Sequence, residues 1–318
     1  MRRLSNSHRL RCASRSICSL AVVLPFLLKA QDDSVIRVET RLVVLHASVA
    51  DKGGKLLTDL PRTAFKVLEN NIEQTMKDFK REDVPVSLGI IIDDSGSMMN
   101  KRQKVATAAL ALVKASNPKD EVFIVNFNDT AYLDVPFTNS IAKLEEGLAR
   151  IESRGGTAMR DAISMSIDYM KKEAKKEKKV LLVITDGDDT ASSENLEKLV
   201  AKCQRSEVLV YAIGLLTEEE QRRQKAAKRA LQTLTTASGG VAFLPKDLTS
   251  VEQLALQVAH EIRNQYTITY SPHVQELDGS FRNIKIVINA RGTPVARTRT
   301  GYYATSEPTA KRVSQNRP

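Results

Sequence analysis

The sequence predicts an α/β protein whose main sheet is mostly parallel and doubly wound, with helices on both faces. Continuous apolar runs such as Val86–Ile92 and Val180–Thr185 are typical of strands that are buried on both faces of a parallel sheet. These runs alternate with amphipathic helical segments, as parallel β–α–β units require. Shorter segments with a strand-like alternation lie before and after this region, so additional β structure is expected on both sides.

The first 30 residues have the composition of a signal peptide. Arg2–Arg15 is basic, Ile17–Leu28 is apolar and too short for an ordinary membrane span, and Ala30 ends an imperfect small-residue cleavage site. We therefore expect an exported protein, either periplasmic or secreted to the cell envelope. Attachment to the membrane is expected only through this segment, if it stays uncleaved.

The net charge of +10 does not indicate a nucleic-acid partner. Six basic residues and no acidic ones lie in the first 30 positions, and the remainder has 42 basic and 38 acidic residues, a net charge of +4. Aromatic residues make up 5% of the chain and are not interleaved with a basic stretch, as single-strand binding would require. One lysine-rich run, Lys171–Lys179, is expected to be a solvated face at the end of a helix.

The cysteines indicate a domain without internal disulfides. Cys12 and Cys18 fall in the predicted signal peptide, which leaves Cys203 alone in the rest of the chain. A single cysteine at the apolar border of a predicted helix is expected to pack as a small buried hydrophobic residue.

Residues 31–83 are predicted to be a β-rich segment. Strands are expected at Val35–Ala50, Phe65–Leu68 and Ile72–Phe79. Asn70–Asn71 lies between the last two and suits a tight hairpin turn, because asparagine tolerates the positive φ that such turns need.

Residues 84–263 are predicted to form the α/β domain. The expected strands are Val86–Ile92, Glu121–Phe127, Ala131–Val135 as an antiparallel edge, Val180–Thr185, Val208–Ile213 and Val241–Leu244. The expected helices are Lys101–Ala115, Ser140–Ile151, Ala158–Lys175, Ser193–Arg205, Glu218–Ala237 and Ser250–Arg263. Ligands of such sheets bind beyond the carboxyl ends of the strands, so functional residues are expected there.

Residues 264–304 return to a β pattern, with strands expected at Tyr266–Tyr270, Ile284–Ile288 and Ala296–Tyr303. Residues 305–318 are polar and are expected to form a disordered tail. Because the strand pattern matches at both ends, we hypothesise that residues 31–83 and 264–304 pair into one β-sandwich, with the α/β domain inserted between them.

Oxygen-bearing side chains follow the expected strand ends. Asp93, Ser95 and Ser97 come directly after the first buried strand, Thr157 starts a helix, and Asp186 follows Val180–Thr185. Alternate residues of an extended loop point the same way, so the two serine hydroxyls can face one point. Hard divalent cations such as Mg²⁺ take oxygen ligands, one or two carboxylates and water. This set is rich in neutral hydroxyls, so a carboxylate from a partner would complete both the charge and the coordination of the ion.

The spacing Asp-x-Ser-x-Ser at these positions resembles the metal-ion-dependent adhesion site of von Willebrand factor type A and integrin inserted domains, over about Val84–Arg263. Thr157 and Asp186 fall where that family has its threonine and aspartate. The flanking segments 37–40 and 263–266 are similar to bacterial exported proteins related to von Willebrand factor A. The resemblance implies a Rossmann-like sheet, a site for Mg²⁺ or Mn²⁺, no enzymatic activity, and a protein partner that presents Asp or Glu.

Several alternatives stay open at this point. Ser97 and Thr157 could instead cap the helices that follow them. Met98 and Met99 could be contact surface or helix-start packing. Three further acids could bind Ca²⁺ or be solvated loop residues: Asp129, Asp188 and Asp189.

The function also has alternatives. The domain could be a structural envelope component in which the metal braces three loops. Asp93 could accept a phosphoryl group, as in haloacid-dehalogenase-like phosphatases, although Ser95 stands where those enzymes have their second acid. No pattern in the sequence indicates the oligomeric state or the identity of the partner.

Overall fold

The computed structural model describes residues 41–150, 153–216 and 221–305. They form an α/β lobe, Val86–Arg263, and a sandwich lobe made from residues 43–80 and 266–303. The predicted signal peptide at 1–30, the expected strand start at Val35 and tail residues 306–318 lie outside the described residues. Within the described ranges, no helix is long and apolar enough to cross a membrane.

The α/β lobe contains a six-stranded sheet in the order β10-β9-β8-β5-β6-β7. Its strands are β5 (Val86–Asp93), β6 (Glu121–Phe127), β7 (Ala131–Thr138), β8 (Lys178–Thr185), β9 (Leu209–Gly214) and β10 (Ala242–Phe243). All neighbouring pairs are parallel except β6 and β7, which are antiparallel. This arrangement confirms the predicted mostly parallel sheet with an antiparallel edge.

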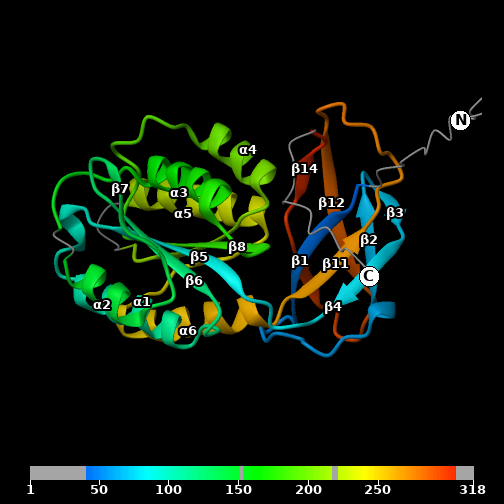
Figure 1. Ribbon diagram of the computed structural model, residues 1–318, viewed down its shortest axis with the longest axis horizontal. Helices are drawn as coiled ribbons and strands as arrows, with labels where there is room; N and C mark the ends of the chain where they lie inside the picture. The colour runs from blue at the N-terminus through cyan, green and yellow to red at the C-terminus, as the bar shows by residue number, and fades with distance from the viewer. Residues whose placement is uncertain (1–40, 151–152, 217–220, 306–318) are drawn as a thin grey trace, which may run out of the picture. The chain divides into compact units, whose positions relative to one another are not determined.

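Six helices cover the two faces of this sheet: α1 (Arg102–Lys114), α2 (Ile141–Ala149), α3 (Met159–Glu173), α4 (Leu196–Ser206), α5 (Gln221–Ser238) and α6 (Val251–Arg263). Figure 1 shows α1, α2 and α6 on one face and α3, α4 and α5 on the other. Helix α4 begins at Leu196 rather than at the predicted Ser193, because the Asn195 side chain accepts a hydrogen bond from Lys198 N at 2.8 Å and caps the helix.

Strand β5 is buried along its whole length. A hydrophobic core lies on each face of the sheet to which it belongs. Leu88, Ile90 and Ile92 point into the core under α1 and α6, whereas Ile91 points into the core under α3 and α4. This two-sided burial explains the uninterrupted apolar run in the sequence. It also places the carboxyl end of β5 near the middle of the sheet edge, where the candidate site begins.

The sandwich lobe contains two four-stranded sheets, in the orders β13-β1-β11-β4 and β14-β12-β2-β3. Its strands are β1 (Val43–Ala50), β2 (Phe65–Glu69), β3 (Ile72–Gln74), β4 (Met76–Lys80), β11 (Tyr266–Tyr270), β12 (Phe281–Ile288), β13 (Val295–Arg297) and β14 (Gly301–Tyr303). β1 pairs with β11 and β2 pairs with β12, both antiparallel. Segments from both sides of the α/β lobe therefore share both sheets, as hypothesised.

Two strands predicted as continuous are divided in the structure, so these predictions were wrong. Ile72–Phe79 is split at Thr75 into β3, which pairs with β2, and β4, which pairs with β11. The segment 296–303 is likewise split into β13 and β14, which belong to different sheets. In both cases the chain passes from one sheet to the other, a corner that the strand pattern alone does not reveal.

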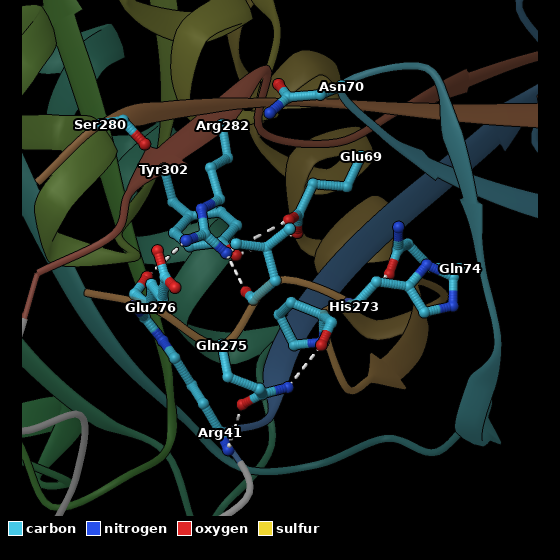
Figure 2. A network of polar contacts seen from close by, with 12 residues as sticks. Arg41, Glu69, Asn70, Gln74, His273, Gln275, Glu276, Ser280, Arg282 and Tyr302 are labelled. Atoms are coloured by element: carbon cyan, nitrogen blue, oxygen red, sulfur yellow. Dashed lines mark hydrogen bonds and ion pairs between the residues drawn. The ribbon is translucent and has the colours of Figure 1, made fainter. Parts of the chain in front are cut away.

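A buried ion pair lies inside the sandwich lobe (Figure 2). Arg282 Nη1 lies 3.5 Å from Glu69 Oε1, and the hydroxyls of Tyr270 and Tyr302 donate to Glu69 Oε2 at 2.7 and 2.9 Å. Burial, together with the hydrogen bond to Glu69, raises the pKa of Tyr302 to about 12. A buried charge is tolerated only with partners, and these contacts join β11 of one sheet to β2, β12 and β14 of the other.

Candidate metal site

Three loops meet at the carboxyl edge of the central sheet. The first follows β5 and contains Asp93, Ser95 and Ser97, the second precedes α3 and contains Thr157, and the third follows β8 and contains Asp186. Neighbouring parallel strands end at the same edge, which is why residues from distant parts of the sequence come together here.

The two serines and Asp186 form a chain of polar contacts. Ser95 Oγ lies 3.1 Å from Ser97 Oγ, and Ser97 Oγ donates to Asp186 Oδ1 at 2.7 Å. Ser95 and Asp186 are buried, at 2% and 8% exposure, whereas Ser97 between them is exposed, so this set of contacts reaches the protein surface. The structure thus brings together hydroxyls and a carboxylate that the sequence spacing predicted to converge.

Asp93 contacts the Ser95 backbone and is 1% exposed. Its Oδ1 accepts a hydrogen bond from Ser95 N at 2.9 Å, and its Oδ2 accepts one from Thr185 Oγ1 at 2.5 Å. Burial raises the pKa of Asp93 above the usual aspartate value, and the hydrogen bonds from Ser95 and Thr185 oppose that shift. The Asp93 carboxylate is therefore held in a fixed orientation at the end of β5.

Thr157 is 6% exposed and lies on the neighbouring loop. A Cβ atom added to Gly187 would lie 3.9 Å from Thr157 Oγ1, which places the hydroxyl beside the Asp186–Gly187 turn. The Thr157 carbonyl accepts hydrogen bonds from Thr190 N and Ala191 N at 2.9 and 3.1 Å. The second and third loops are thereby tied to each other.

Further backbone contacts join the first loop to the second. Gly96 N donates to Gly155 O at 3.2 Å, and Arg154 N donates to Asp94 O at 2.9 Å. Gly155 has a φ of +75°, and a Cβ atom there would overlap the carboxylate of Asp129. Glycine is required at this position for both reasons.

Two of the additional acids fix the loops. Asp129 Oδ1 accepts from Gly156 N at 2.8 Å, and Asp189 Oδ2 accepts from Arg160 N at 2.7 Å. These residues were expected first as solvated loop acids. In the structure they are hydrogen-bond acceptors that hold the second loop and the start of α3 in place.

The interpretation of Ser97 and Thr157 as helix caps was wrong. Lys101 is the N-cap residue of α1 and Ala158 is that of α3, and neither helix start has a side-chain capping bond. Ser97 instead lies in a short 3-10 turn, Gly96–Met98, with its hydroxyl directed at Asp186. Both side chains are thus available to the site.

Sequence reasoning missed Lys101 and Thr185. The Lys101 ammonium forms an ion pair with Asp186 Oδ2, and the two side chains are 13% and 1% exposed. Lys101 follows Ser97 by about one helical turn, so its reach back toward the site could have been inferred from the spacing. Thr185 directly precedes Asp186, but its contact with Asp93 depends on the pairing of β8 with β5.

The residues present fit a hard divalent cation. The set consists of two buried carboxylates and three hydroxyls, all oxygen donors, without the imidazole or thiolate groups that favour zinc. In the described part of the chain, no group of three or more His, Cys, Asp and Glu residues could hold a metal ion. The candidate ligands include only two residues of these types, Asp93 and Asp186, because the other three are hydroxyl side chains.

The lobe is therefore a Rossmann-like α/β domain with an oxygen-lined site at the carboxyl edge of its sheet. Residues 88–188 match the family model of the von Willebrand factor type A domain. The chain thus contains a von Willebrand factor type A domain, as the motif at Asp93 predicted.

Two curated proteins are similar to parts of the chain. Inter-alpha-trypsin inhibitor heavy chain H4 from Bos taurus is 25% identical over 146 residues, 41% of this chain. Integrin alpha-11 from Homo sapiens is 37% identical over 83 residues, 24% of this chain. The matches span only 16% and 7% of the lengths of these two relatives.

Two solved structures show the same fold. A von Willebrand factor type A protein from Catenulispora acidiphila has a TM-score of 0.50 and 11% identity, over 85% of this chain and 76% of that one. Proximal thread matrix protein 1 from the mussel byssus, with a zinc-occupied metal-ion-dependent adhesion site, has a TM-score of 0.50 and 15% identity, over 61% and 50%.

Proposed function

We propose that this chain is an exported, non-enzymatic binding protein whose α/β lobe uses one divalent cation to hold an acidic residue of a protein partner. The cation would be held by Asp93, Ser95, Ser97, Thr157 and Asp186, with Mg²⁺ or Mn²⁺ as the expected ion and Ca²⁺ as a third choice. When bound, such an ion supplies a positive charge and a coordination position for a carboxylate oxygen.

The observation that carries this proposal is the polar chain from Ser95 through Ser97 to Asp186, at 3.1 and 2.7 Å. The three hydroxyls are neutral, and the Lys101 ammonium offsets one of the two carboxylate charges at its contact with Asp186, so a bound divalent ion would keep an uncompensated positive charge. A ligand carboxylate is the group that would balance it, and that preference gives the site its selectivity for acidic partners.

The surrounding residues orient these oxygens. Thr185 Oγ1 and Ser95 N donate to the two oxygens of Asp93. Thr190 N and Ala191 N donate to Thr157 O, which ties the second loop to the third. Preorganised loops of this kind bind a ligand without first having to order themselves. Rigid presentation supports a role in recognition.

Export is part of the proposal and rests on the composition of residues 1–30. A phosphoryl-accepting role for Asp93 has less support, because Ser95 stands where haloacid-dehalogenase-like phosphatases have their second acid, the group that would protonate the leaving group. A structural role in the envelope remains the main rival, and binding experiments separate the two.

The test is affinity capture from a cell-envelope extract with the purified protein, in magnesium chloride and in EDTA. We expect a protein that is captured only with Mg²⁺ and is lost with either Asp93→Ala or Thr157→Ala. Thr107→Ala, which removes an exposed hydroxyl from α1 outside the site, is the matched control and should capture normally.

Circular dichroism should be measured for each variant, to show that the loss of capture is not caused by loss of the fold. Capture that is equal in EDTA, or equal in the Asp93→Ala variant with intact fold, would refute the proposal. Substitution of the captured partner's acidic residues by their amides should abolish binding, because an amide does not supply the negative charge.

A further inference from the structure

The turn that connects β6 to β7, residues 128–130, lies against the second loop of the candidate metal site, although it contains no candidate ligand. Asp129 Oδ1 accepts a hydrogen bond from Gly156 N at 2.8 Å, and Asn128 O accepts one from Ala158 N at 2.6 Å. These two donors directly precede and follow the candidate ligand of that loop in the sequence. The turn therefore holds the backbone on both sides of this ligand.

Tyr132, two residues after the turn on β7, contacts the first loop. Its hydroxyl donates to Asp94 Oδ2 at 3.1 Å. Asp94 is 1% exposed and lies in the sequence between the candidate ligands Asp93 and Ser95. Burial, and then the charge of Asp94, raises the pKa of Tyr132 to about 12, so the phenol stays protonated and donates at neutral pH. The Tyr132 hydroxyl thus holds the residue that separates two candidate ligands.

The two adjacent aspartates of the first loop are held from opposite sides of β5. Asp93 Oδ2 accepts from Thr185 Oγ1 on β8, whereas Asp94 Oδ2 accepts from the Tyr132 hydroxyl on β7. β8 and β6 are the two neighbours of β5, and β7 lies beyond β6 at the edge of the sheet. Removing the Tyr132 hydroxyl would therefore free the first loop on one side and leave the contact of Asp93 in place.

The turn and Tyr132 belong to one hairpin, which consists of β6, residues 128–130 and β7. Phe127 pairs with Ala131 and Asn126 pairs with Tyr132, so the position of Tyr132 relative to the turn is fixed. The same piece of structure therefore holds the first loop and the second loop. Removing a group that orients metal ligands from outside the ligand set typically lowers metal affinity about ten- to one-hundred-fold.

We propose that the β6–β7 hairpin, through Asp129 and Tyr132, positions the first two loops of the candidate metal site and thereby sets its affinity for the cation. Asp129 and Tyr132 are positioning residues, and neither side chain contacts the ion. This inference rests on the proposed function, because the two loops contain four of the five candidate ligands. It adds an element of the site that the spacing of the ligands does not reveal.

The first test is calorimetric titration of the full chain and its Tyr132→Phe variant with Mg²⁺. The variant keeps the ring and loses the hydroxyl, so we expect about ten-fold weaker binding. Tyr169→Phe is the matched control, because the Tyr169 hydroxyl accepts from Phe137 N at 3.1 Å near the other end of β7. Its Mg²⁺ affinity should equal that of the unchanged chain. The electron paramagnetic resonance spectrum of bound Mn²⁺, which reports the symmetry of the ligands, should change only in Tyr132→Phe.

The second test uses two substitutions of Asp129. Asp129→Ala removes the acceptor for Gly156 N and should weaken Mg²⁺ binding about ten-fold. Asp129→Asn keeps an oxygen acceptor without the charge and should bind Mg²⁺ nearly as well as the unchanged chain. A residue that ligates the ion, or acts on it through its charge, would lose affinity in both variants, so equal weakening would overturn the positioning role.

The outcomes separate this inference from the proposed function. If the folded, unchanged chain takes up neither Mg²⁺ nor Mn²⁺, both fail. If that chain binds Mg²⁺ and the Tyr132→Phe and Asp129→Ala variants bind it equally well, only the role of the hairpin fails. The same holds if Tyr132→Phe lowers thermal stability in EDTA without changing Mg²⁺ affinity. Circular dichroism verifies each fold, and Tyr132→Phe decides the question if Asp129→Ala does not fold.

Discussion

At the scale of single residues, Lys101 is a basic side chain in direct contact with a candidate ligand. Its ammonium pairs with Asp186 in a contact whose two side chains are largely buried. A divalent cation at the same place would neutralise the same carboxylate. Lys101 and the cation would therefore both neutralise Asp186. The ion pair with Lys101 lowers the affinity for the cation, and a bound cation reduces the stability that this ion pair contributes.

We predict that Lys101→Met lowers the free energy of unfolding by roughly 3 kcal/mol in EDTA, because one partner of a buried ion pair is removed. Mg²⁺ should restore much of this loss and should bind the variant more tightly than the unchanged chain. Thermal unfolding and calorimetric titration measure the two effects. Lys104→Met, on the exposed face of α1, is the control, and equal Mg²⁺ affinity in all three proteins would contradict the argument.

His46 gives a second prediction, on acid stability. Burial, followed by the positive charges of Lys178 and Arg299, lowers the pKa of His46 to about 3. The folded protein therefore keeps His46 neutral while the unfolded chain takes up a proton near pH 6.5. Stability should be unaffected above that pH and should fall as the pH is lowered from 6.5 toward 3. Denaturant unfolding of His46→Gln should show a weaker fall across this range; an unchanged pH profile would argue against it.

The convergence of Ser95, Ser97 and Asp186 was predictable from sequence, because oxygen-bearing side chains follow strands that end at the same edge of the sheet. That they bind a metal ion, with Asp93 and Thr157, stays a prediction. The contacts of Lys101 and Thr185 were not predictable, since they depend on helix placement and on the pairing of β8 with β5. Lys178 is another example. It belongs to a lysine-rich run that predicted a solvated face, yet helix α3 ends at Glu173 and Lys178 is 3% exposed inside β8.

At the scale of elements, Gly89 controls how β5 packs against its neighbours. It is the one glycine in the buried apolar run of β5, and a Cβ atom there would overlap the Phe123 ring and Leu181. Phe123 in turn contacts the rings of Phe137 and Tyr169 at centroid distances of 4.8 and 4.9 Å. The missing side chain of Gly89 thus makes room for an aromatic cluster on one face of the sheet.

We predict that Gly89→Ala destabilises the protein by about 1–3 kcal/mol through overpacking. Phe123→Leu in the same background should recover part of this loss, because the smaller side chain clears the added methyl group. Chemical denaturation of the single and double variants forms a cycle that measures the coupling. Additive effects would show that Phe123 is not the residue that Gly89 accommodates.

The type and approximate position of each helix and strand were largely predictable. The sheet to which each strand of the sandwich lobe belongs was not. The parallel strands and all six helices follow from apolar periodicity, and Asn70 and Asn71 adopt the positive φ values, 49° and 66°, that their hairpin turn requires. The break at Thr75 was missed because a strand that changes sheets keeps its alternating pattern. Only the tertiary pairing of β3 and β4 shows the corner.

At the scale of the whole molecule, the chain enters the α/β lobe from the sandwich lobe and returns to it. The two cores of the α/β lobe consist of residues between Val86 and Ile262, whereas the sandwich core combines residues from both ends of the described chain. β1 pairs with β11 and with β13, so the N-terminal strands depend on the C-terminal ones.

We predict that a fragment of residues 84–263 folds cooperatively and takes up Mg²⁺ with the affinity of the full chain. It should melt at a lower temperature, because it lacks the ion pair of Arg297 with buried Glu261, 2.8 Å in the full chain. A fragment of residues 41–83 should show no cooperative transition. Calorimetry of both fragments is the measurement, and an unfolded 84–263 fragment would contradict the proposed domain boundaries.

The most direct measurement of the central claim is calorimetric titration of the folded full chain with Mg²⁺ and with Mn²⁺. The oxygen set at Asp93, Ser95, Ser97, Thr157 and Asp186 predicts saturable uptake of one ion per chain, lost in Asp93→Ala while the fold is retained. A folded protein that takes up neither ion, or an Asp93→Ala variant that takes up either ion equally well, would contradict it.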